Sequence, residues 1–406
     1  MAKSSGTLRF RVVVIGASAG GVEALTELVK MLPATLPAAV FVVLHVSSAT
    51  PSLLPHILKR AGRLPARHAR DGELIRPRRI YIAPPDHHLL LNAGRVAVTR
   101  GPRENNARPA IDPLFRTAAR HYGPTVVGVV LSGTLDDGTL GLMDIKRAGG
   151  IALVQDPAEA MFPSMPNSAI ENVAVDRVLP LKEMGPLIAR LAREPVPIQA
   201  GAAFMAARKQ SNRPDIAEVG NDNLKNRLMD GPPSQYTCPE CGGVLWELKN
   251  GNLLRYRCHV GHGFTAESLM AAQTEKLEAA MWGSLRALEE VAGMRRRLAE
   301  RSRMGGWELI ARRYDEQAKT YEDRAAVIRA VLVEERADHI DGQIARSVEQ
   351  LAAQAEDLDA ELGPTDPAAA FGASRPPDPE IGGPMVLGGQ SSHSDKSNGR
   401  QSGKRT

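Results

Sequence analysis

Short runs of β-branched and other apolar residues alternate with stretches of helical spacing through the first half of the chain. The first run, Arg11–Ile15, leads into glycines, and the second, Ala39–Val46, follows a helical stretch at Val22–Leu32. Continuous apolar runs of this length are typical of strands buried on both faces of a parallel sheet. The pattern predicts further strands at Ile80–Ala83, Arg95–Thr99, Val126–Ser132 and Ile151–Gln155, and further helices at Asp112–Tyr122 and Leu140–Ala148.

This alternation predicts a doubly wound α/β domain over residues 1–195, with three layers and a mainly parallel sheet. Residues 196–233 have no sustained period and mix Pro, Gly, Asn and charged residues, which is typical of a linker. A compact cysteine-bearing segment follows at 234–265, and a helical coiled-coil region at 266–362. Pro, Gly, Ser and Asp dominate 363–406, where we expect a disordered tail.

Apolar residues recur at helical spacing in three series after residue 266, and Gly305-Gly306 separates the first two. This spacing predicts a helical hairpin or a three-helix coiled coil. The helices would pack on one another, pair with the helical bundle of a receptor, or form a homodimer. The series are Leu277, Met281, Leu285, Leu288 and Ala292; Tyr314, Tyr321, Ala325, Ile328 and Leu332; and Ile340, Ile344, Val348, Leu351 and Leu358.

Composition narrows the class of protein. Hydrophobic residues make up 43% of the 406 residues and aromatic residues only 4%, so a globular protein with aliphatic cores is expected. The N-terminus lacks the apolar run of a signal peptide, and no run approaches the ~18 apolar residues of a membrane span. Three cysteines exclude a secreted disulfide scaffold and favour a reducing cytoplasm. Much of the net charge of +5 belongs to the tail, so a nucleic-acid partner is not favoured.

The first expected strand runs into Gly16-Ala-Ser18-Ala-Gly20-Gly21 and then into a helix. A glycine-rich turn of this kind serves either a dinucleotide's pyrophosphate or a serine nucleophile, because both need a close approach to a helix N-terminus. The serine fits the pattern G-x-S-x-G, whereas it replaces the middle glycine of the dinucleotide fingerprint. The second strand ends in His45 rather than the acid that holds a ribose. Ser18 and His45 are therefore expected to face one crevice as nucleophile and general base.

A third strand end carries acidic residues. The run Val126–Leu131 leads into Ser132-Gly-Thr-Leu-Asp-Asp137-Gly138 and a further helix. An acid here would orient the imidazole and stabilise its charged form. Asp136 and Asp137 are equally compatible with a helix N-cap, and the spacing alone does not separate the two interpretations.

These segments together resemble the catalytic domain of the chemotaxis protein-glutamate methylesterases (CheB-type) over residues 9–190. The resemblance implies a doubly wound domain that hydrolyses γ-glutamyl methyl esters on chemoreceptors with a serine triad. It implies Ser18 as nucleophile, His45 as base and Asp137, rather than Asp136, as the orienting acid. The motifs that carry it are Ile15–Gly21, Leu44-His45, Arg79–His88, Arg108–Asp112, Leu131–Gly138 and Met165-Pro166.

The implied mechanism is acyl transfer in two steps, with methanol leaving first and water hydrolysing the acyl-enzyme. Backbone N–H groups of Ala19 and Thr134 are candidate oxyanion donors, each typically worth about 3 kcal/mol, and no cofactor is needed for this step. The family often has Met-Gly where Thr134-Leu135 stand, which would alter the oxyanion pocket, and Met-Pro where Val46-Ser47 stand. Relatives usually begin with a phosphorylatable receiver domain, for which this sequence leaves no room; if it is full length, regulation must come from elsewhere.

The three cysteines form a metal-ligand pattern. Cys238 and Cys241 are spaced as C-x2-C, and Cys258 and His262 follow as C-x3-H, which completes a Cys3His set for structural zinc. His259 is the reserve ligand. Aromatic residues gather around the cysteines, as a tiny domain without a large core requires. A divergent methylesterase subgroup has a similar tail, whose role the resemblance does not imply; protein docking or a structural role is favoured over nucleic-acid binding.

The sequence thus predicts a cytoplasmic protein-glutamate methylesterase that acts on the cytoplasmic helices of methyl-accepting chemoreceptors, with other chemotaxis proteins as further candidate partners. Deamidation of receptor glutamines is an open second activity. The competing class is a non-enzymatic signalling adaptor that uses the zinc ribbon and the helices. A nucleotide-binding oxidoreductase is third, because His45 stands where a ribose-binding acid belongs.

Overall fold

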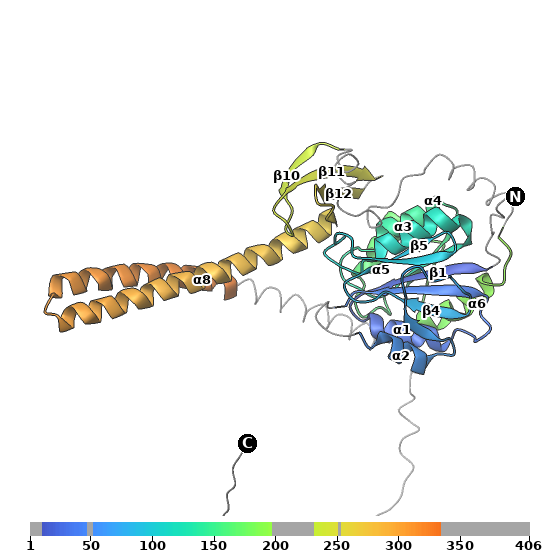
Figure 1. Ribbon diagram of the computed structural model, residues 1–406, viewed down its shortest axis with the longest axis horizontal. Coiled ribbons are helices and arrows are strands. Elements are labelled where there is room, and N and C mark those ends of the chain that lie inside the picture. Colours follow the sequence, from blue (N-terminus) through green and yellow to red (C-terminus); the bar gives the residue numbers. More distant parts are fainter. Residues whose placement is uncertain (1–9, 47–51, 197–230, 251–252, 334–406) are drawn as a thin grey trace, which may run out of the picture. The chain divides into compact units, whose positions relative to one another are not determined.

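The computed structural model describes residues 10–46, 52–196, 231–250 and 253–333. Its largest element is a parallel sheet of seven strands in the order β3-β4-β2-β1-β7-β8-β9 (Figure 1). Each parallel neighbour is reached through a crossover, which confirms the predicted α/β class. The strands are β1 (Arg11–Ala17), β2 (Ala38–Leu44), β3 (Ala66–His68), β4 (Arg79–Ile82), β7 (Val126–Val130), β8 (Ile151–Gln155) and β9 (Arg177–Leu179).

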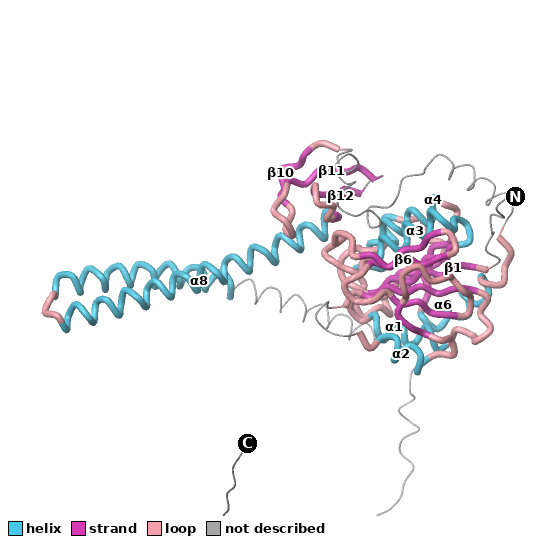
Figure 2. Tube along the Cα trace, in the orientation of Figure 1, coloured by secondary structure: helices cyan, strands magenta, loops and turns pink. Residues whose placement is uncertain are grey.

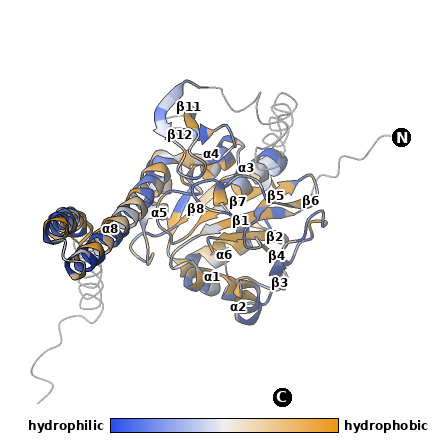
Figure 3. Cartoon of the chain, turned by 60° about the vertical axis from the view of Figure 1, so that its left-hand side comes forward, coloured by the Kyte–Doolittle hydropathy of each residue, from blue (hydrophilic) through white to orange (hydrophobic). Residues whose placement is uncertain are grey.

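Helices cover both faces of this sheet, as a doubly wound fold requires. Alternate residues of β1 enter different cores: Val13 and Ile15 pack on one face, and Val12 and Val14 on the other. The strands carry much of the hydrophobic colour in Figure 3, because both of their faces are buried. The first face is covered by α1 (Gly21–Lys30), α2 (Leu54–Ala61) and α6 (Leu181–Leu191), and the second by α3 (Ile111–Tyr122), α4 (Thr139–Arg147) and α5 (Ser164–Asn172).

The predicted strand Arg95–Thr99 forms, but it does not join the main sheet. It is β6 (Arg95–Thr99), which pairs antiparallel with β5 (His88–Asn92) in a hairpin of its own. A short 3₁₀ helix, η1 (Gly123–Thr125), leads into β7. The strand itself was predictable from its β-branched residues, whereas its partner was set by the hairpin turn at Asn92–Arg95.

A second, antiparallel sheet carries the cysteines (Figure 2). Its order is β10-β11-β12-β13, and its register pairs Leu245 with Cys258 and Tyr256 with Phe264. The buried residues that hold it together are few, and the cysteines Cys238 and Cys258 are among them. The strands are β10 (Pro233–Thr237), β11 (Val244–Asn250), β12 (Leu253–Cys258) and β13 (Gly263–Thr265).

The chain continues from β13 into the long helix α8 (Ala266–Met304) and, after the predicted break at Gly305-Gly306, into a second helix at 308–333. Residues seven apart are buried along each helix, as in a coiled-coil hairpin. The third predicted series, Ile340–Leu358, lies outside the described residues. Among the described helices, none is long and apolar enough to cross a membrane. The buried residues are Leu285, Ala292 and Ala299, then Ala311, Ala318, Ala325 and Leu332.

Candidate functional site

Ser18 and His45 follow the carboxyl ends of two neighbouring parallel strands. The register of β1 and β2 pairs Ala17 with Leu44, and the His45 N–H donates to the Ala17 carbonyl oxygen at 3.1 Å. The two residues therefore occupy equivalent positions at one edge of the sheet. Gly20, the N-cap of α1, has a φ of 69°, a left-handed conformation that glycine adopts without steric cost. The turn thus presents Ser18 at a helix N-terminus.

Asp137 reaches the same edge from the loop after β7. Its Oδ2 lies 2.8 Å from His45 Nε2 and also accepts the Ile111 N–H at 2.7 Å. Its Oδ1 accepts the Asn105 side-chain amide at 2.9 Å and the Asp112 N–H at 3.2 Å. Four donors therefore hold one buried carboxylate, and two of them are backbone amides of the first turn of α3. A helix N-terminus stabilises negative charge at such a position.

Asp112 lies behind Asp137 and caps the other helix. Its Oδ1 accepts the N–H groups of Gly138 at 3.1 Å and Gly141 at 2.7 Å, at the start of α4. The two acids thus cap each other's helices. Burial and the charge of Asp137 raise the pKa of Asp112 to about 8. Burial would also raise the pKa of Asp137, but the hydrogen bond and charge of His45 lower it overall. At neutral pH the negative charge of the pair therefore resides on Asp137.

The imidazole of His45 has a defined orientation. A carboxylate only accepts hydrogen bonds, so the nitrogen that faces Asp137 must carry the proton. That nitrogen is Nε2, which leaves Nδ1 as the nitrogen with a free lone pair. Among the described residues, no hydrogen bond joins Ser18 Oγ to the imidazole. Catalytic contacts of this kind often tighten only when substrate is bound.

The candidate oxyanion donors lie beside Ser18. The Ser18 N–H is engaged with the Ser132 carbonyl oxygen at 3.0 Å, whereas neither Ala19 nor Thr134 donates its N–H within the described part of the chain. A Cβ on Gly133 would lie 2.8 Å from Ser18 Cβ and 2.1 Å from Met165 Sδ. The Gly133 backbone therefore approaches Ser18 as closely as glycine alone permits, and Thr134 is exposed at the same point.

The structure brings in polar residues for which no role was predicted. Asn105 and Asp112 complete the surroundings of Asp137. Asn105 stands in a segment whose polarity was its only signal, whereas Asp112 ends the motif Arg108–Asp112 that carries the family resemblance. Asp136, the less favoured candidate, does not contact His45; its Oδ1 accepts a hydrogen bond from the Thr265 hydroxyl at 2.8 Å. Leu135, where the family often has glycine, has a left-handed φ of 61°. That conformation is unfavourable for leucine.

The four predicted metal ligands gather in one cluster. The ligand atoms of Cys238, Cys241, Cys258 and His262 all lie within 4.8 Å of one another. Cys241 Sγ lies 3.6 Å from Cys258 Sγ, and His262 Nδ1 lies 3.5 Å from Cys258 Sγ. A tetrahedral zinc with Zn–S bonds of about 2.3 Å needs sulfurs about 3.8 Å apart, so the donors fit this metal. His259 lies outside the cluster and packs on Gly243.

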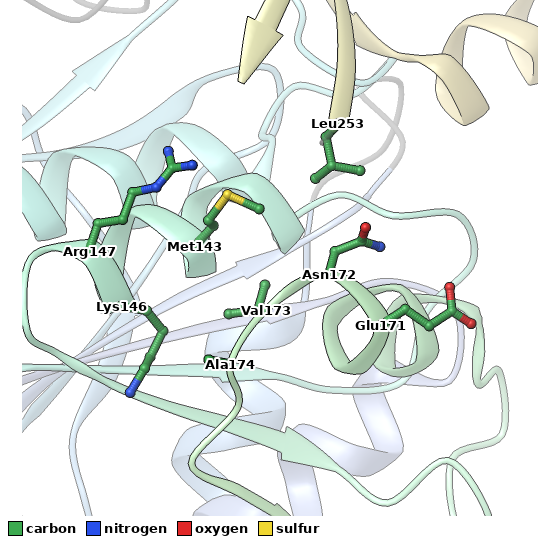
Figure 4. A pocket seen from close by; sticks show the side chains of 8 residues that line it. All are labelled: Met143, Lys146, Arg147, Glu171, Asn172, Val173, Ala174 and Leu253. Atoms are coloured by element: carbon green, nitrogen blue, oxygen red, sulfur yellow. The ribbon is translucent and has the colours of Figure 1, made fainter. Parts of the chain in front are cut away.

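A hollow of about 510 Å³ lies away from both clusters (Figure 4). It is lined by the last turns of α4 and α5 together with Leu253 of β12. The carboxyl end of α4 leads into β8, so this hollow lies toward the amino edge of the sheet, opposite Ser18. The lysine among its lining residues, Lys146, is paired with Asp176 at 2.7 Å. The hollow is therefore not the candidate active site.

Comparison with known proteins gives one family match. The model of the CheB methylesterase family matches residues 13–188. The protein-glutamate methylesterase/protein-glutamine glutaminase 2 of Anaeromyxobacter dehalogenans is 42% identical over 185 residues, which are 46% of this chain and 54% of that protein. The chain thus spans about half the length of that relative. A putative enzyme of the same description from Leptospira interrogans is 37% identical over 185 residues, with 96% of its length covered.

Among solved structures, the catalytic domain of the Thermotoga maritima CheB methylesterase is similar, with 34% identity and a TM-score of 0.43. The similarity covers 45% of this chain and 98% of that domain. The family model covers residues 13–188, within the α/β domain. It therefore says nothing about the antiparallel sheet β10–β13, called the metal-ligand sheet below, or about the helical hairpin.

Proposed function

The chain belongs to the CheB methylesterase family of ester hydrolases, and from that premise we propose that it hydrolyses glutamate γ-methyl esters on chemoreceptors. One observation supports this most strongly. The imidazole of His45 is hydrogen-bonded to a buried, charged Asp137 at the strand end beside Ser18. A serine hydrolase needs such an arrangement, and the family resemblance implies these three residues for it.

In the first half-reaction, His45 Nδ1 takes the proton of Ser18 Oγ as the oxygen attacks the ester carbonyl. Asp137 keeps the Nε2 proton in place and stabilises the imidazolium that forms. The N–H groups of Ala19 and Thr134 receive the oxyanion. The imidazolium then protonates the departing methoxide, so that methanol leaves and Ser18 carries the acyl group.

In the second half-reaction, His45 takes a proton from water, and the resulting hydroxide attacks the acyl-enzyme. Ser18 Oγ leaves and regains its proton from His45. The net reaction consumes one ester and one water and gives one glutamate carboxylate, one proton and one methanol. Glutamine would follow the same path with ammonia as the leaving group, and the names of both relatives cite such a glutaminase activity. We include receptor glutamine deamidation as a second candidate activity.

The C-terminal part supports a docking or structural role. We propose that the Cys3His cluster holds one structural zinc, because four protein ligands leave no open coordination position. Apolar side chains remain exposed on the helical hairpin, among them Leu277 and Val291 on α8. The cytoplasmic helices of a methyl-accepting chemoreceptor are the proposed partner, which places the protein in the cytoplasm. Homodimerisation through the same helices is the alternative.

The experiment is an assay of methanol release from methylated receptor. The Ser18→Ala variant should lose release, whereas Ser284→Ala, which changes an exposed serine of α8, should match the wild type. Retained hydrolysis in Ser18→Ala would remove the proposed nucleophile. No release by the wild type from any of a panel of methylated receptors would favour the adaptor, and tight binding of NAD would favour the oxidoreductase.

A further inference from the structure

The metal-ligand sheet is joined to the active-site surroundings through the loop at residues 103–107. The Asn105 N–H donates to the Gly263 carbonyl oxygen at 2.8 Å, and the Gly263 N–H donates to the Arg103 carbonyl oxygen at 3.1 Å. Glu104 and Gly263 thereby form a parallel β-bridge. The first residue of β13, directly after the ligand His262, is thus hydrogen-bonded to the catalytic domain.

Glu104 anchors this junction with charge. Its carboxylate is 1% exposed and lies 2.6 Å from Arg255 Nη2 and 3.5 Å from Arg257 Nη2 of β12. The same carboxylate lies 3.0 Å from Arg116 Nη2 of α3. Burial alone would raise the pKa of Glu104, but the three guanidinium groups hold it well below its usual range. The ionised Glu104 therefore contacts both strand β12 and helix α3. The first turn of α3 is the one whose backbone N–H groups donate to Asp137.

The next residue, Asn105, connects the junction to the triad acid. Its Nδ2 donates to Asp137 Oδ1 at 2.9 Å and to Asp112 Oδ2 at 3.0 Å. Its Oδ1 accepts the Thr265 N–H at 3.2 Å and the Ser268 hydroxyl at 3.3 Å. The amide is buried and uses both of its ends, one on the triad acid and one on the start of α8. Its backbone φ of 50° is one that asparagine tolerates better than most residues.

The start of α8 is fixed by the same contacts. Thr265 is the N-cap of α8 and forms a capping box with Ser268. The Thr265 hydroxyl also donates to Asp136 Oδ1, the residue before the triad acid. The N-cap is therefore hydrogen-bonded both to Asn105, which donates to Asp137, and to Asp136, which precedes Asp137 in the chain.

We propose that Asn105 is a positioning residue for the triad, and that the metal-ligand sheet and α8 set its position and so control ester hydrolysis. This inference rests on the proposed function. It assigns the regulation of the site to the C-terminal part of this chain: contacts that hold β13 and α8 in place keep Asp137 and His45 aligned. A partner that moves α8, or loss of the metal ligands, lowers the rate.

The first test compares two neighbouring asparagines. Asn106 has a similar left-handed φ of 61° but is exposed, so Asn106→Ala is a matched control for backbone strain. Asn105→Ala should lower kcat for methanol release by about 10- to 100-fold with KM within about twofold, because a buried donor to a charged group is lost. It should also shift the downfield NMR resonance of the His45 Nε2 proton, which a general loss of stability would not move. Asn106→Ala should change neither.

The second test disrupts the contacts at the start of α8 and measures the reactivity of Ser18 directly. A fluorophosphonate labels an activated serine without any receptor, so the labelling rate reports the triad independently of the substrate. Ser268→Ala and Thr265→Val should slow labelling of Ser18, and Thr265→Ser, which keeps the hydroxyl, should restore it. Chelation of the metal should slow labelling and shift the His45 resonance.

The outcomes separate the inference from the proposed function. If the wild type labels at Ser18 but releases no methanol from any receptor, the proposed substrate is wrong, and the labelling rates still decide the inference. If Asn105→Ala and Thr265→Val label as fast as the wild type and keep the His45 resonance, the inference is wrong.

Discussion

The α/β domain and the metal-ligand sheet each hold a cluster of polar side chains in place, but the interactions that hold it differ. In the α/β domain, fully buried aliphatic residues on both faces of a seven-stranded sheet hold the strand ends that carry Ser18 and His45. In the metal-ligand sheet, a small apolar cluster surrounds two of the cysteines, and little else is buried. The first region has a core large enough to fold without a metal, whereas we propose that the second depends on a metal held by its four ligands.

The distribution of tryptophan makes this difference measurable. All three tryptophans, Trp246, Trp282 and Trp307, belong to β11 and the helical hairpin. Tryptophan fluorescence therefore follows the C-terminal part alone, while hydrogen exchange of the parallel strands follows the α/β core. The following predictions use the two signals to separate the regions.

Metal removal should have the largest effect, and the unfolding that it causes should be confined to the metal-ligand sheet. Zinc binding by a four-ligand site contributes on the order of 10 kcal/mol to the folding of small domains. We expect a chelator to unfold β10–β13 and change the fluorescence of Trp246, while the amides of β1 and β2 stay protected from exchange. Loss of protection in β1 would show that the two regions fold as one unit.

The two histidines near the cluster provide a matched pair. His262→Ala should abolish stoichiometric zinc binding, and His259→Ala should leave one zinc per chain, because only His262 places its nitrogen among the sulfurs. Metal analysis of the purified variants checks this. Equal loss in both variants would mean that His259 also ligates the metal.

The Asp137→Asn variant should have the next largest effect, on activity rather than folding. An amide keeps the shape but no longer holds the His45 tautomer, so kcat should fall by about 10³- to 10⁴-fold. Tryptophan fluorescence and the exchange of β1 should remain those of the wild type. A variant that retains kcat within about tenfold would argue against Asp137 as the orienting acid.

Substitution of Asp136 should have the smallest effect, which is on the pH dependence of the free energy of unfolding. Burial raises the pKa of Asp136 to about 7, although its hydrogen bond from Thr265 opposes the shift. The folded state therefore holds this proton more tightly than the unfolded state, and stability should fall as pH rises from about 4 to 7. Asp136→Asn should remove roughly 4 kcal/mol of that loss over the whole titration, since the shift spans about three pH units at about 1.4 kcal/mol each. Urea unfolding at pH 5 and pH 8 measures the difference; identical pH dependence in both proteins would contradict it.

The sequence predicted those parts of the fold and site that depend on local pattern. Apolar runs gave the strands β1, β2 and β7, and parallel strands bring their carboxyl ends to one edge, so Ser18, His45 and Asp137 could be placed together. The spacing of the cysteines similarly predicted which four residues gather their ligand atoms in one cluster. It was less predictable which residues of each apolar series would be buried. Leu285 and Ala292 are buried, but Leu277 of the same series is exposed.

The contacts that surround the site could not be predicted in the same way. Asn105 meets Thr265 across 160 residues of sequence, and Asp136 meets it across 129. No periodicity or spacing relates these positions, because the pairing arises only when the metal-ligand sheet packs on the loop at 103–107. Polar residues that act between elements leave no local signal, whereas those at strand ends do.

The central claim is that Ser18 carries the ester chemistry. The most direct measurement is mass-spectrometric mapping of the folded protein after treatment with a serine-directed fluorophosphonate. We expect one adduct, on Ser18, that is absent in Ser18→Ala and greatly slowed in His45→Ala, because the hydroxyl is reactive only beside its base. No adduct on the folded wild-type protein, or an adduct on another residue, would contradict the claim.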